Sequence, residues 1–208
     1  MVSPPSPTRQ DYYAVLADLL PERALVVTAL GNASYLWSVV RDRPENFYFE
    51  DAMGLALPLA VGLALAQHSR PVFVVEGDGG LFMHMGALVT LGAAAPRNLT
   101  VLLIQNGVHA ASGGQPLTNA SLDLAQLARA AGIQNTKNVT GLDDFAPALR
   151  SALGTNGPRF LVLRTEPDVN VVRPSIAFDP VMTKHRFTTA IGAPVYTPTL
   201  FGGGLTHQ

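Results

Sequence analysis

The sequence contains no cysteine among its 208 residues. Disulfide bonds, thiolate metal sites and a cysteine nucleophile are therefore excluded. If the protein binds a metal ion, oxygen or imidazole ligands must hold it.

An excess of either charge is also lacking, since 14 Lys and Arg residues stand against 15 Asp and Glu residues, with a formal net charge of −1. Such a chain has no electrostatic field that would gather nucleic acid or an anionic membrane surface. We therefore expect a small, discrete ligand rather than a polyanion.

A long uninterrupted apolar run is missing as well. The longest apolar stretch, Met53 to Ala66, is interrupted by Gly54, Pro58 and Gly62 and is too short to cross a bilayer. It is expected to form a buried helix. The N-terminal segment MVSPPSPTRQD has no basic start followed by an apolar run, so it does not resemble a secretory signal, and we expect a cytoplasmic protein.

The composition, 48% hydrophobic and 14% charged, suits one globular domain with a sizeable core. We assign this domain to residues 1–191. Residues 192–208 are rich in Gly, Pro and Thr and are expected to form an extended or disordered tail.

Apolar runs alternate with segments of helical spacing along the domain. The expected strands are Ala24–Leu30, Pro71–Val75, Leu99–Ile104 and Phe160–Arg164. The expected helices are Asp11–Leu20, one capped by Asn32 or Ser34, Met53–Gln67, one from about Gly80 to Ala94, Leu122–Ala131 and Asp143–Leu153. Continuous apolar strands suit a parallel sheet covered on both faces, so the predicted fold class is α/β, doubly wound. The Gly- and Ala-rich Met53–Gln67 helix is expected to pack close to another backbone.

Three of the expected strands end in unusual loops: Gly31-Asn32, Gly77-Asp78-Gly79-Gly80 and Asn106-Gly107. Ligands of open parallel sheets bind outside the carboxyl ends of the strands, so these loops should converge on one rim. Glycines allow the backbone to approach a phosphate, and a helix opening near Gly80 would present N–H groups to it. The pattern predicts a phosphate site.

Asp78 and Asn106 offer a carboxylate and a neutral carbonyl, which are oxygen ligands suited to Mg²⁺ beside phosphates. A Gly-Asp-Gly in a loop is by itself more often a turn or a helix cap. Here a strand precedes Gly77, a helix follows, and 26 residues (80–105) separate Gly79 from Asn106 at the end of the next strand. The combination favours a metal and phosphate site.

This motif and spacing resemble the thiamine diphosphate motif of the decarboxylase and acetolactate synthase superfamily. Four further segments, Asp42–Tyr48, Ala52–Ala56, Gly113–Pro116 and Lys184–Phe187, are similar to the small subunit of sulfopyruvate decarboxylases and to the C-terminal region of phosphonopyruvate decarboxylases. The resemblance runs from about Ala24 to Ile191.

The resemblance implies roles for individual residues. Mg²⁺ would be held by Asp78, Asn106 and the main-chain carbonyl of Val108. The diphosphate would lie against Gly31, Asn32, Ala33, Gly77, Gly79, Gly80 and Leu81. Met53 would be the apolar wedge that bends the cofactor, although an apolar Met is ordinarily a core residue. The carbonyl of Asp51 would accept a hydrogen bond from the aminopyrimidine, but its side chain stands where relatives carry glycine and has no implied role.

Several polar residues remain open between two interpretations. His109 is a candidate catalytic proton donor, since imidazole titrates near neutrality, or a loop histidine. Ser112 and Gln115 are candidates for lining the substrate pocket beside it. Glu76 is expected to orient an arginine or backbone N–H groups, and His84 to be structural or at a subunit contact.

Arg41, Arg43 and Arg173 are candidates for binding an anionic group of the substrate, with solvated surface positions as the default interpretation.

The family also requires a glutamate from a pyrimidine-binding domain, for which this chain has no room beside the predicted domain. The resemblance therefore implies a partner subunit that supplies the activating glutamate, in a hetero-oligomer with two copies of each chain (α₂β₂) or more. The implied function is a two-component decarboxylase that uses thiamine diphosphate and Mg²⁺ to release CO₂ and an aldehyde from a small 2-oxo acid. A carboligase subunit similar to acetolactate synthase, or a non-catalytic cofactor-binding subunit, are the alternatives.

Overall fold

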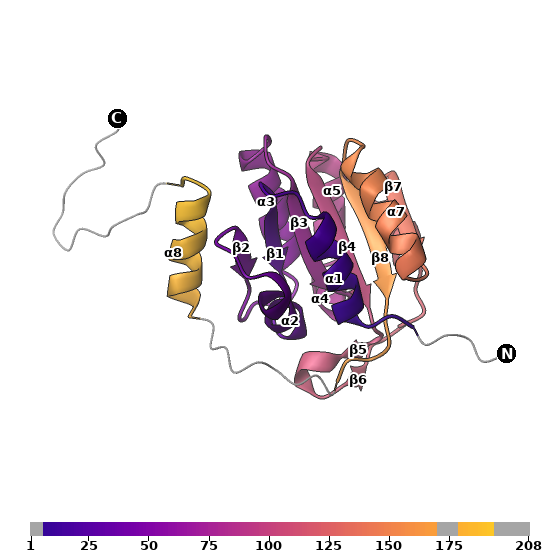
Figure 1. Ribbon diagram of the computed structural model, residues 1–208. Helices are drawn as coiled ribbons and strands as arrows, with labels where there is room; N and C mark the ends of the chain where they lie inside the picture. Colours follow the sequence, from indigo (N-terminus) through magenta and orange to yellow (C-terminus); the bar gives the residue numbers. More distant parts are fainter. Residues whose placement is uncertain (1–5, 170–178, 194–208) are drawn as a thin grey trace.

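Parallel strands form the centre of the molecule in the computed structural model, which describes residues 6–169 and 179–193 (Figure 1). Across these residues the main sheet has six strands in the order β2-β1-β3-β4-β8-β7, and every neighbouring pair is parallel. The strands are β1 (Leu25–Thr28), β2 (Asn46–Tyr48), β3 (Val72–Gly77), β4 (Leu99–Gln105), β7 (Asn135–Val139) and β8 (Arg159–Arg164). A small antiparallel pair, β5 (Val108–His109) and β6 (Gln115–Pro116), flanks the 3₁₀ helix η1 (Ala110–Ser112).

Helices cover both faces of this sheet (Figure 1). One face packs against α1 (Arg9–Leu19), α2 (Asn32–Arg41) and α7 (Leu142–Leu153). The other packs against α3 (Ala56–Ala66), α4 (Asp78–Met83), α5 (Gly86–Ala94) and α6 (Leu124–Ala130), while α8 (Pro180–Ala190) lies beside β2 at the edge. The predicted doubly wound α/β fold is confirmed. The predicted tail lies almost wholly outside the described residues.

The central strands β3 and β4 are buried at nearly every position because each face meets a helical layer, and most of their residues are apolar. In β3, Val72 and Val74 pack into one hydrophobic cluster, and Phe73 and Val75 pack into the other. Burying a side chain of this kind contributes about 1.5–3 kcal/mol relative to leaving it exposed. Burial on both faces explains why the sequence shows continuous apolar runs instead of alternation.

Some elements differ from the predictions. The edge strand β7 was not predicted, because its alternate residues are exposed and polar. The short edge strand β2 and helix α8 were not predicted either. The single helix expected from about Gly80 to Ala94 is two helices, α4 and α5, separated at His84 and Met85.

The close backbone contact expected along the Met53–Gln67 helix does not occur at Gly62. A β-carbon at Gly62 would meet no other described atom within 4 Å. The close approach occurs before helix α3, where a β-carbon at Gly54 would lie 2.7 Å from the Gly80 carbonyl oxygen. A tighter one joins α5 to the end of α6, where a β-carbon at Gly92 would lie 1.9 Å from the carbonyl oxygen of Ala131.

The topology opens a crevice between β1 and β3. Strand β1 lies between β2 and β3, and the chain leaves it toward α2 on one face. The chain leaves β3 toward α4 and α5 on the opposite face. Because the two connections diverge, a crevice forms outside the carboxyl ends of these strands, where ligands of such sheets bind.

No helix in the ranges 6–169 and 179–193 is both long enough and apolar enough to cross a membrane.

Candidate active site

The loops after β1, β3 and β4 converge, as predicted, on a cavity of about 290 Å³ at the carboxyl edge of the sheet. Ten of the predicted site residues line it: Asn32, Ala33, Met53, Gly77, Asp78, Gly79, Gly80, Asn106, Val108 and His109. Gly31, Asp51 and Leu81 are not among its lining residues, and the Leu81 side chain is part of the hydrophobic core. Strands far apart in the sequence thus bring the motif together.

Asp78 connects the loop after β3 to the loop after β4. One oxygen, Oδ1, accepts the N–H of Gly79 at 2.9 Å, and Oδ2 accepts the N–H of Gly107 at 2.8 Å. Its side chain is only 2% exposed. Burial raises the pKa of the Asp78 carboxyl, although these N–H groups favour its ionised form. A divalent cation beside the carboxylate would compensate for the lost solvation.

Asn106 follows β4 and lies in the same cavity. Its Oδ1 accepts the N–H of Val108 at 3.1 Å, and its Nδ2 donates to Oδ1 of Asp168 at 2.7 Å. Asp168 forms an ion pair with Arg9, whose Nε lies 2.7 Å from Oδ2. Burial opposes ionisation of Asp168, but the charge of Arg9 and the hydrogen bond from Asn106 outweigh it and lower the pKa.

Neither Arg9, which also lines the cavity, nor Asp168 was predicted from the sequence. One signal was present for Asp168, because it follows β8 at the same edge of the sheet as the three predicted loops. No local pattern pointed to Arg9, which lies on α1 at the start of the chain.

The backbone around the cavity fits a diphosphate. Helix α2 starts at Asn32, and within the described part of the chain no side chain caps it, so its first N–H groups are available to an anion. Gly31 has φ of +73°, which favours glycine, and a β-carbon there would lie 2.9 Å from that of Ala111. A β-carbon at Gly79 would lie 2.8 Å from Nδ1 of His109. At both positions a neighbouring side chain lies so close to the glycine that a β-carbon would not fit without a shift.

Asn32 contributes a further sign of a ligand site. Its Nδ2 donates to the carbonyl of Asp168 at 2.8 Å. Its Oδ1 is buried and has no hydrogen-bond partner among the residues that the structure describes. A buried acceptor without a partner is unfavourable unless a ligand or bound water completes it.

Met53 lies in the turn before α3, not within a helix. Its side chain is 40% exposed and lines the cavity, so it is not an ordinary core residue. Asp51 is exposed two residues earlier. The predicted contact of its carbonyl with the aminopyrimidine stays a prediction.

His109 and Ser112 line the cavity from the β5–β6 segment, while Gln115 is outside its lining. Ser112 Oγ donates to Oε1 of Gln115 at 3.1 Å, and Gln115 Nε2 donates back to the Ser112 carbonyl at 3.1 Å. Gln115 therefore contacts the cavity-lining serine without lining the cavity itself.

Glu76 is only 1% exposed and lines the cavity beside the motif. Its Oε1 accepts the N–H of Gly77 at 2.9 Å, as expected for a residue that orients backbone N–H groups. No arginine or lysine in the described ranges forms an ion pair with it. Burial raises the pKa of Glu76 to about 7. His84 contacts the carbonyl oxygen of Gly54 at 3.2 Å, which fits the expected structural role.

The arginine candidates for substrate binding lie elsewhere. Arg41 donates to the carbonyl of Ala17 and to Oε2 of Glu22, and Arg43 donates to the carbonyls of Glu22 and Ala24. Ala24 precedes β1, at the edge of the sheet opposite the cavity. Neither arginine lines the cavity. Arg173 lies outside the described residues.

Comparison with protein families matches residues 30–163 to the thiamine pyrophosphate enzyme, C-terminal TPP binding domain. Phosphonopyruvate decarboxylase of Streptomyces viridochromogenes is 39% identical over 95% of this chain and 50% of its own length. Sulfopyruvate decarboxylase subunit beta of Methanocaldococcus jannaschii is 31% identical over 89% of this chain and 97% of its own length. The chain thus spans about half of the first relative and nearly all of the second.

Solved structures give the same fold. A putative thiamin diphosphate-dependent enzyme of Mycobacterium smegmatis superposes with a TM-score of 0.66 and 26% identity, over 77% of this chain and 32% of that chain. Benzoylformate decarboxylase of Polynucleobacter necessarius has a TM-score of 0.67 over 79% of this chain and 34% of its own. At 21% identity, this second likeness concerns the fold alone.

Proposed function

The chain belongs to the thiamine pyrophosphate enzymes, as their C-terminal TPP-binding domain, and we propose that it is the Mg²⁺- and cofactor-binding subunit of a two-component 2-oxo acid decarboxylase. Its reaction releases CO₂ and an aldehyde from a small 2-oxo acid. The observation that carries this proposal is the shared cavity of Asp78, Asn106 and the first turn of α2.

The metal ligands in this proposal are the Asp78 carboxylate, Oδ1 of Asn106 and the main-chain carbonyl of Val108. Across the described residues, no group of three or more Asp, Glu, His or Cys side chains is placed to hold a metal ion. A site with one carboxylate needs further oxygen ligands, and Mg²⁺ commonly takes them from phosphates. We therefore expect Mg²⁺ and thiamine diphosphate to bind together.

The rest of the cavity has distinct tasks. The loop 31–33 and the glycines of the motif bind the diphosphate, and Met53 supports the bend of the cofactor. Thiamine diphosphate, when bound, supplies the electron sink for loss of CO₂. His109 faces the same cavity and is the proposed proton donor, with Ser112 held toward the substrate by Gln115.

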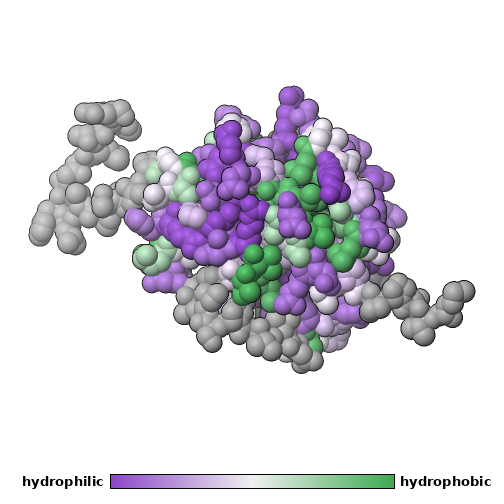
Figure 2. Space-filling view, in the orientation of Figure 1, coloured by the Kyte–Doolittle hydropathy of each residue, from purple (hydrophilic) through white to green (hydrophobic). Residues whose placement is uncertain are grey.

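A partner chain with the pyrimidine-binding domain supplies the activating glutamate in this proposal. The face of α1, α2 and α7 is largely hydrophilic, with smaller hydrophobic areas (Figure 2). Most of the large exposed apolar residues lie instead on and around α3, α4 and α5: Met53, Leu55, Leu59, Leu65, Met83, Met85 and Val89. Such a concentration is typical of an interaction surface. The match over nearly a whole subunit beta supports a hetero-oligomer, with α₂β₂ as its smallest form.

The substitution Asp78→Ala tests the cofactor site, since it removes the only charged ligand. We expect it to abolish Mg²⁺-dependent binding of thiamine diphosphate in calorimetry with the full chain and any copurifying partner. Asp18→Ala, at an exposed position of α1, is the control and should bind normally. Normal cofactor affinity in Asp78→Ala would refute the assignment.

Product analysis tests the reaction. The chain and its copurified partner are incubated with a series of 2-oxo acids, with and without an acceptor aldehyde. We expect CO₂ and an aldehyde in both cases. A ligated hydroxyketone would indicate the carboligase alternative, and cofactor binding without any turnover would indicate the non-catalytic one.

A further inference from the structure

The orientation of the Asn106 side chain matters for metal binding, because only its oxygen can be a ligand. The oxygen and nitrogen ends of an amide are similar in size, so surrounding hydrogen bonds decide which end faces a site. In Asn106, Nδ2 donates to Oδ1 of Asp168 at 2.7 Å. The reversed amide would place its oxygen against a carboxylate, which is repulsive. Asp168 therefore selects the orientation together with the N–H of Val108, which requires the oxygen end of the amide.

Asp168 is itself held from two sides. Its Oδ2 lies 2.7 Å from Nε of Arg9, and its main-chain carbonyl accepts Nδ2 of Asn32 at 2.8 Å. The side chains of Arg9 and Asp168 are only 6% and 11% exposed. Because Arg9 neutralises it, the second carboxylate orients Asn106 without adding net charge to the cavity.

The bonds of Asn106 leave room for a metal ion. Its Oδ1 accepts one hydrogen bond, from the N–H of Val108 at 3.1 Å. A carbonyl oxygen has two lone pairs, so the second is available to a cation.

We propose that Asp168 and Arg9 are positioning residues that keep the Asn106 carbonyl turned toward Mg²⁺, an inference that rests on the proposed function. The arrangement is that of outer groups that orient metal ligands, whose loss typically weakens metal affinity by about 10- to 100-fold. Neither residue needs to touch the ion.

The first test compares Asp168→Ala with Asp42→Ala. Both remove a carboxylate that binds an arginine and a second polar side chain, but Asp42 contacts Arg186 and Tyr48 at the β2 edge. Mg²⁺ is titrated by calorimetry into the full chain, with any copurifying partner, at saturating thiamine diphosphate. We expect about 10- to 100-fold weaker Mg²⁺ binding in Asp168→Ala and wild-type binding in Asp42→Ala.

Circular dichroism and thermal unfolding without cofactor establish that each variant is folded. If Asp168→Ala does not fold with Arg9 unpaired, Arg9→Met/Asp168→Ala removes both buried charges. It should show the same loss of Mg²⁺ affinity.

A rescue separates positioning from a merely structural role. Asn106→Asp installs a carboxylate, whose two oxygens are equivalent acceptors and need no orienting partner. We expect Asp168→Ala to weaken Mg²⁺ binding in the wild-type background but to cause no loss in the Asn106→Asp background. A structural defect, or direct coordination of Mg²⁺ by Asp168, would give the same loss in both backgrounds and overturn the inference.

Failure of the proposed function and failure of this inference give different results. If the wild-type protein shows no Mg²⁺-dependent binding of thiamine diphosphate, the proposed function fails and the inference with it. If the wild type binds and Asp168→Ala binds Mg²⁺ equally well, only the inference fails.

Discussion

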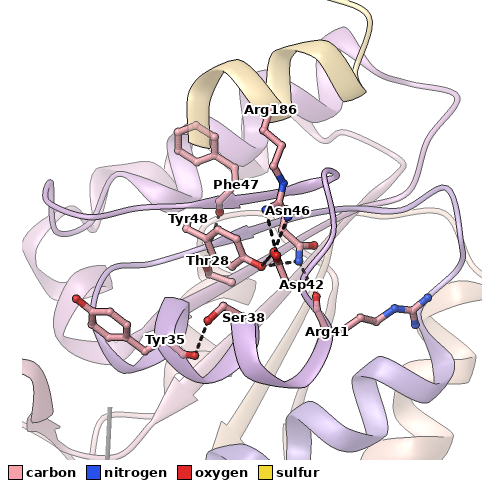
Figure 3. A network of polar contacts seen from close by, with 9 residues as sticks. All are labelled: Thr28, Tyr35, Ser38, Arg41, Asp42, Asn46, Phe47, Tyr48 and Arg186. Carbon is pink, nitrogen blue, oxygen red and sulfur yellow. Dashed lines mark hydrogen bonds and ion pairs between the residues drawn. The ribbon is translucent and has the colours of Figure 1, made fainter. Parts of the chain in front are cut away.

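Two arginine–aspartate pairs in this protein share their chemistry and differ in their surroundings. Arg9 and Asp168 meet beside the cavity, with exposed fractions of 6% and 11%. Arg186 of α8 and Asp42 meet at the β2 edge, with 39% and 47%. There Asp42 also accepts the hydroxyl of Tyr48 at 2.8 Å, and Asn46 donates to that hydroxyl at 2.8 Å (Figure 3).

Burial, not the pairing itself, determines how much stability is lost when one partner is removed. At the exposed pair, water solvates whichever charge remains, so the loss is small. At the buried pair, a remaining charge has little water and no other ion-pair partner among the described residues. The buried pair is accordingly suited to hold a side chain in one position, while the exposed pair joins α8 to the residue that follows α2.

The largest expected effect is on the buried pair. Arg9→Met leaves Asp168 ionised without its partner and should lower the free energy of unfolding by about 3–5 kcal/mol. Urea unfolding of the cofactor-free chain at neutral pH measures it. A loss below about 1 kcal/mol would mean that the buried pair behaves like a surface pair and would contradict the role given to burial.

Glu76 differs from both aspartates, because it is a buried carboxyl without a cationic partner among the described residues. Its pKa rises from 4.5 to about 7 in the folded chain. Between these values the unfolded chain ionises while the folded chain keeps its proton, so stability is complete below pH 4.5, falls as the pH rises to about 7 and then levels. The rise corresponds to about 3 kcal/mol.

Glu76→Gln should remove this dependence and stabilise the cofactor-free protein at pH 8. Urea unfolding of both proteins across pH 4.5–8.5 measures the difference. Parallel stability curves for wild type and variant would contradict the prediction.

The smallest effect is expected at the exposed pair. Arg186→Gln should lower the free energy of unfolding by less than about 1 kcal/mol, and added salt should reduce the difference further. The measurement is urea unfolding at low and high ionic strength. A loss as large as that of Arg9→Met would show that attachment of α8 depends on this pair far more than its exposure suggests.

How well each element was predicted from the sequence depended on its burial. Strands β3 and β4 were found because both faces are covered, so most of their residues are apolar. Strand β7 was missed because it lies at an edge, where Asn135 and Lys137 are exposed and the pattern resembles a loop. The break between α4 and α5 was missed because the apolar residues on both sides of it continue a helical pattern.

The convergence of the three loops on one cavity could be predicted from the sequence. Parallel strands end at one edge, so loops after β1, β3 and β4 had to meet there whatever the details of packing. Met53 entered through resemblance alone, because an exposed apolar wedge and a buried core methionine look the same in a sequence. The positions of Arg41 and Arg43 outside the cavity could not be predicted, because charge alone does not say at which edge of the sheet a residue lies.

The sequence by itself determined that Asp78 and Asn106 follow two consecutive strands of an α/β chain, since strand length and loop chemistry are local properties. Only the tertiary structure decided that Arg9 meets Asp168 and that Asp168 orients Asn106. Arg9 and Asp168 are separated by 159 positions, and their contact depends on where α1 packs across the sheet. No local pattern encodes such a meeting, because it results from the packing of the whole chain.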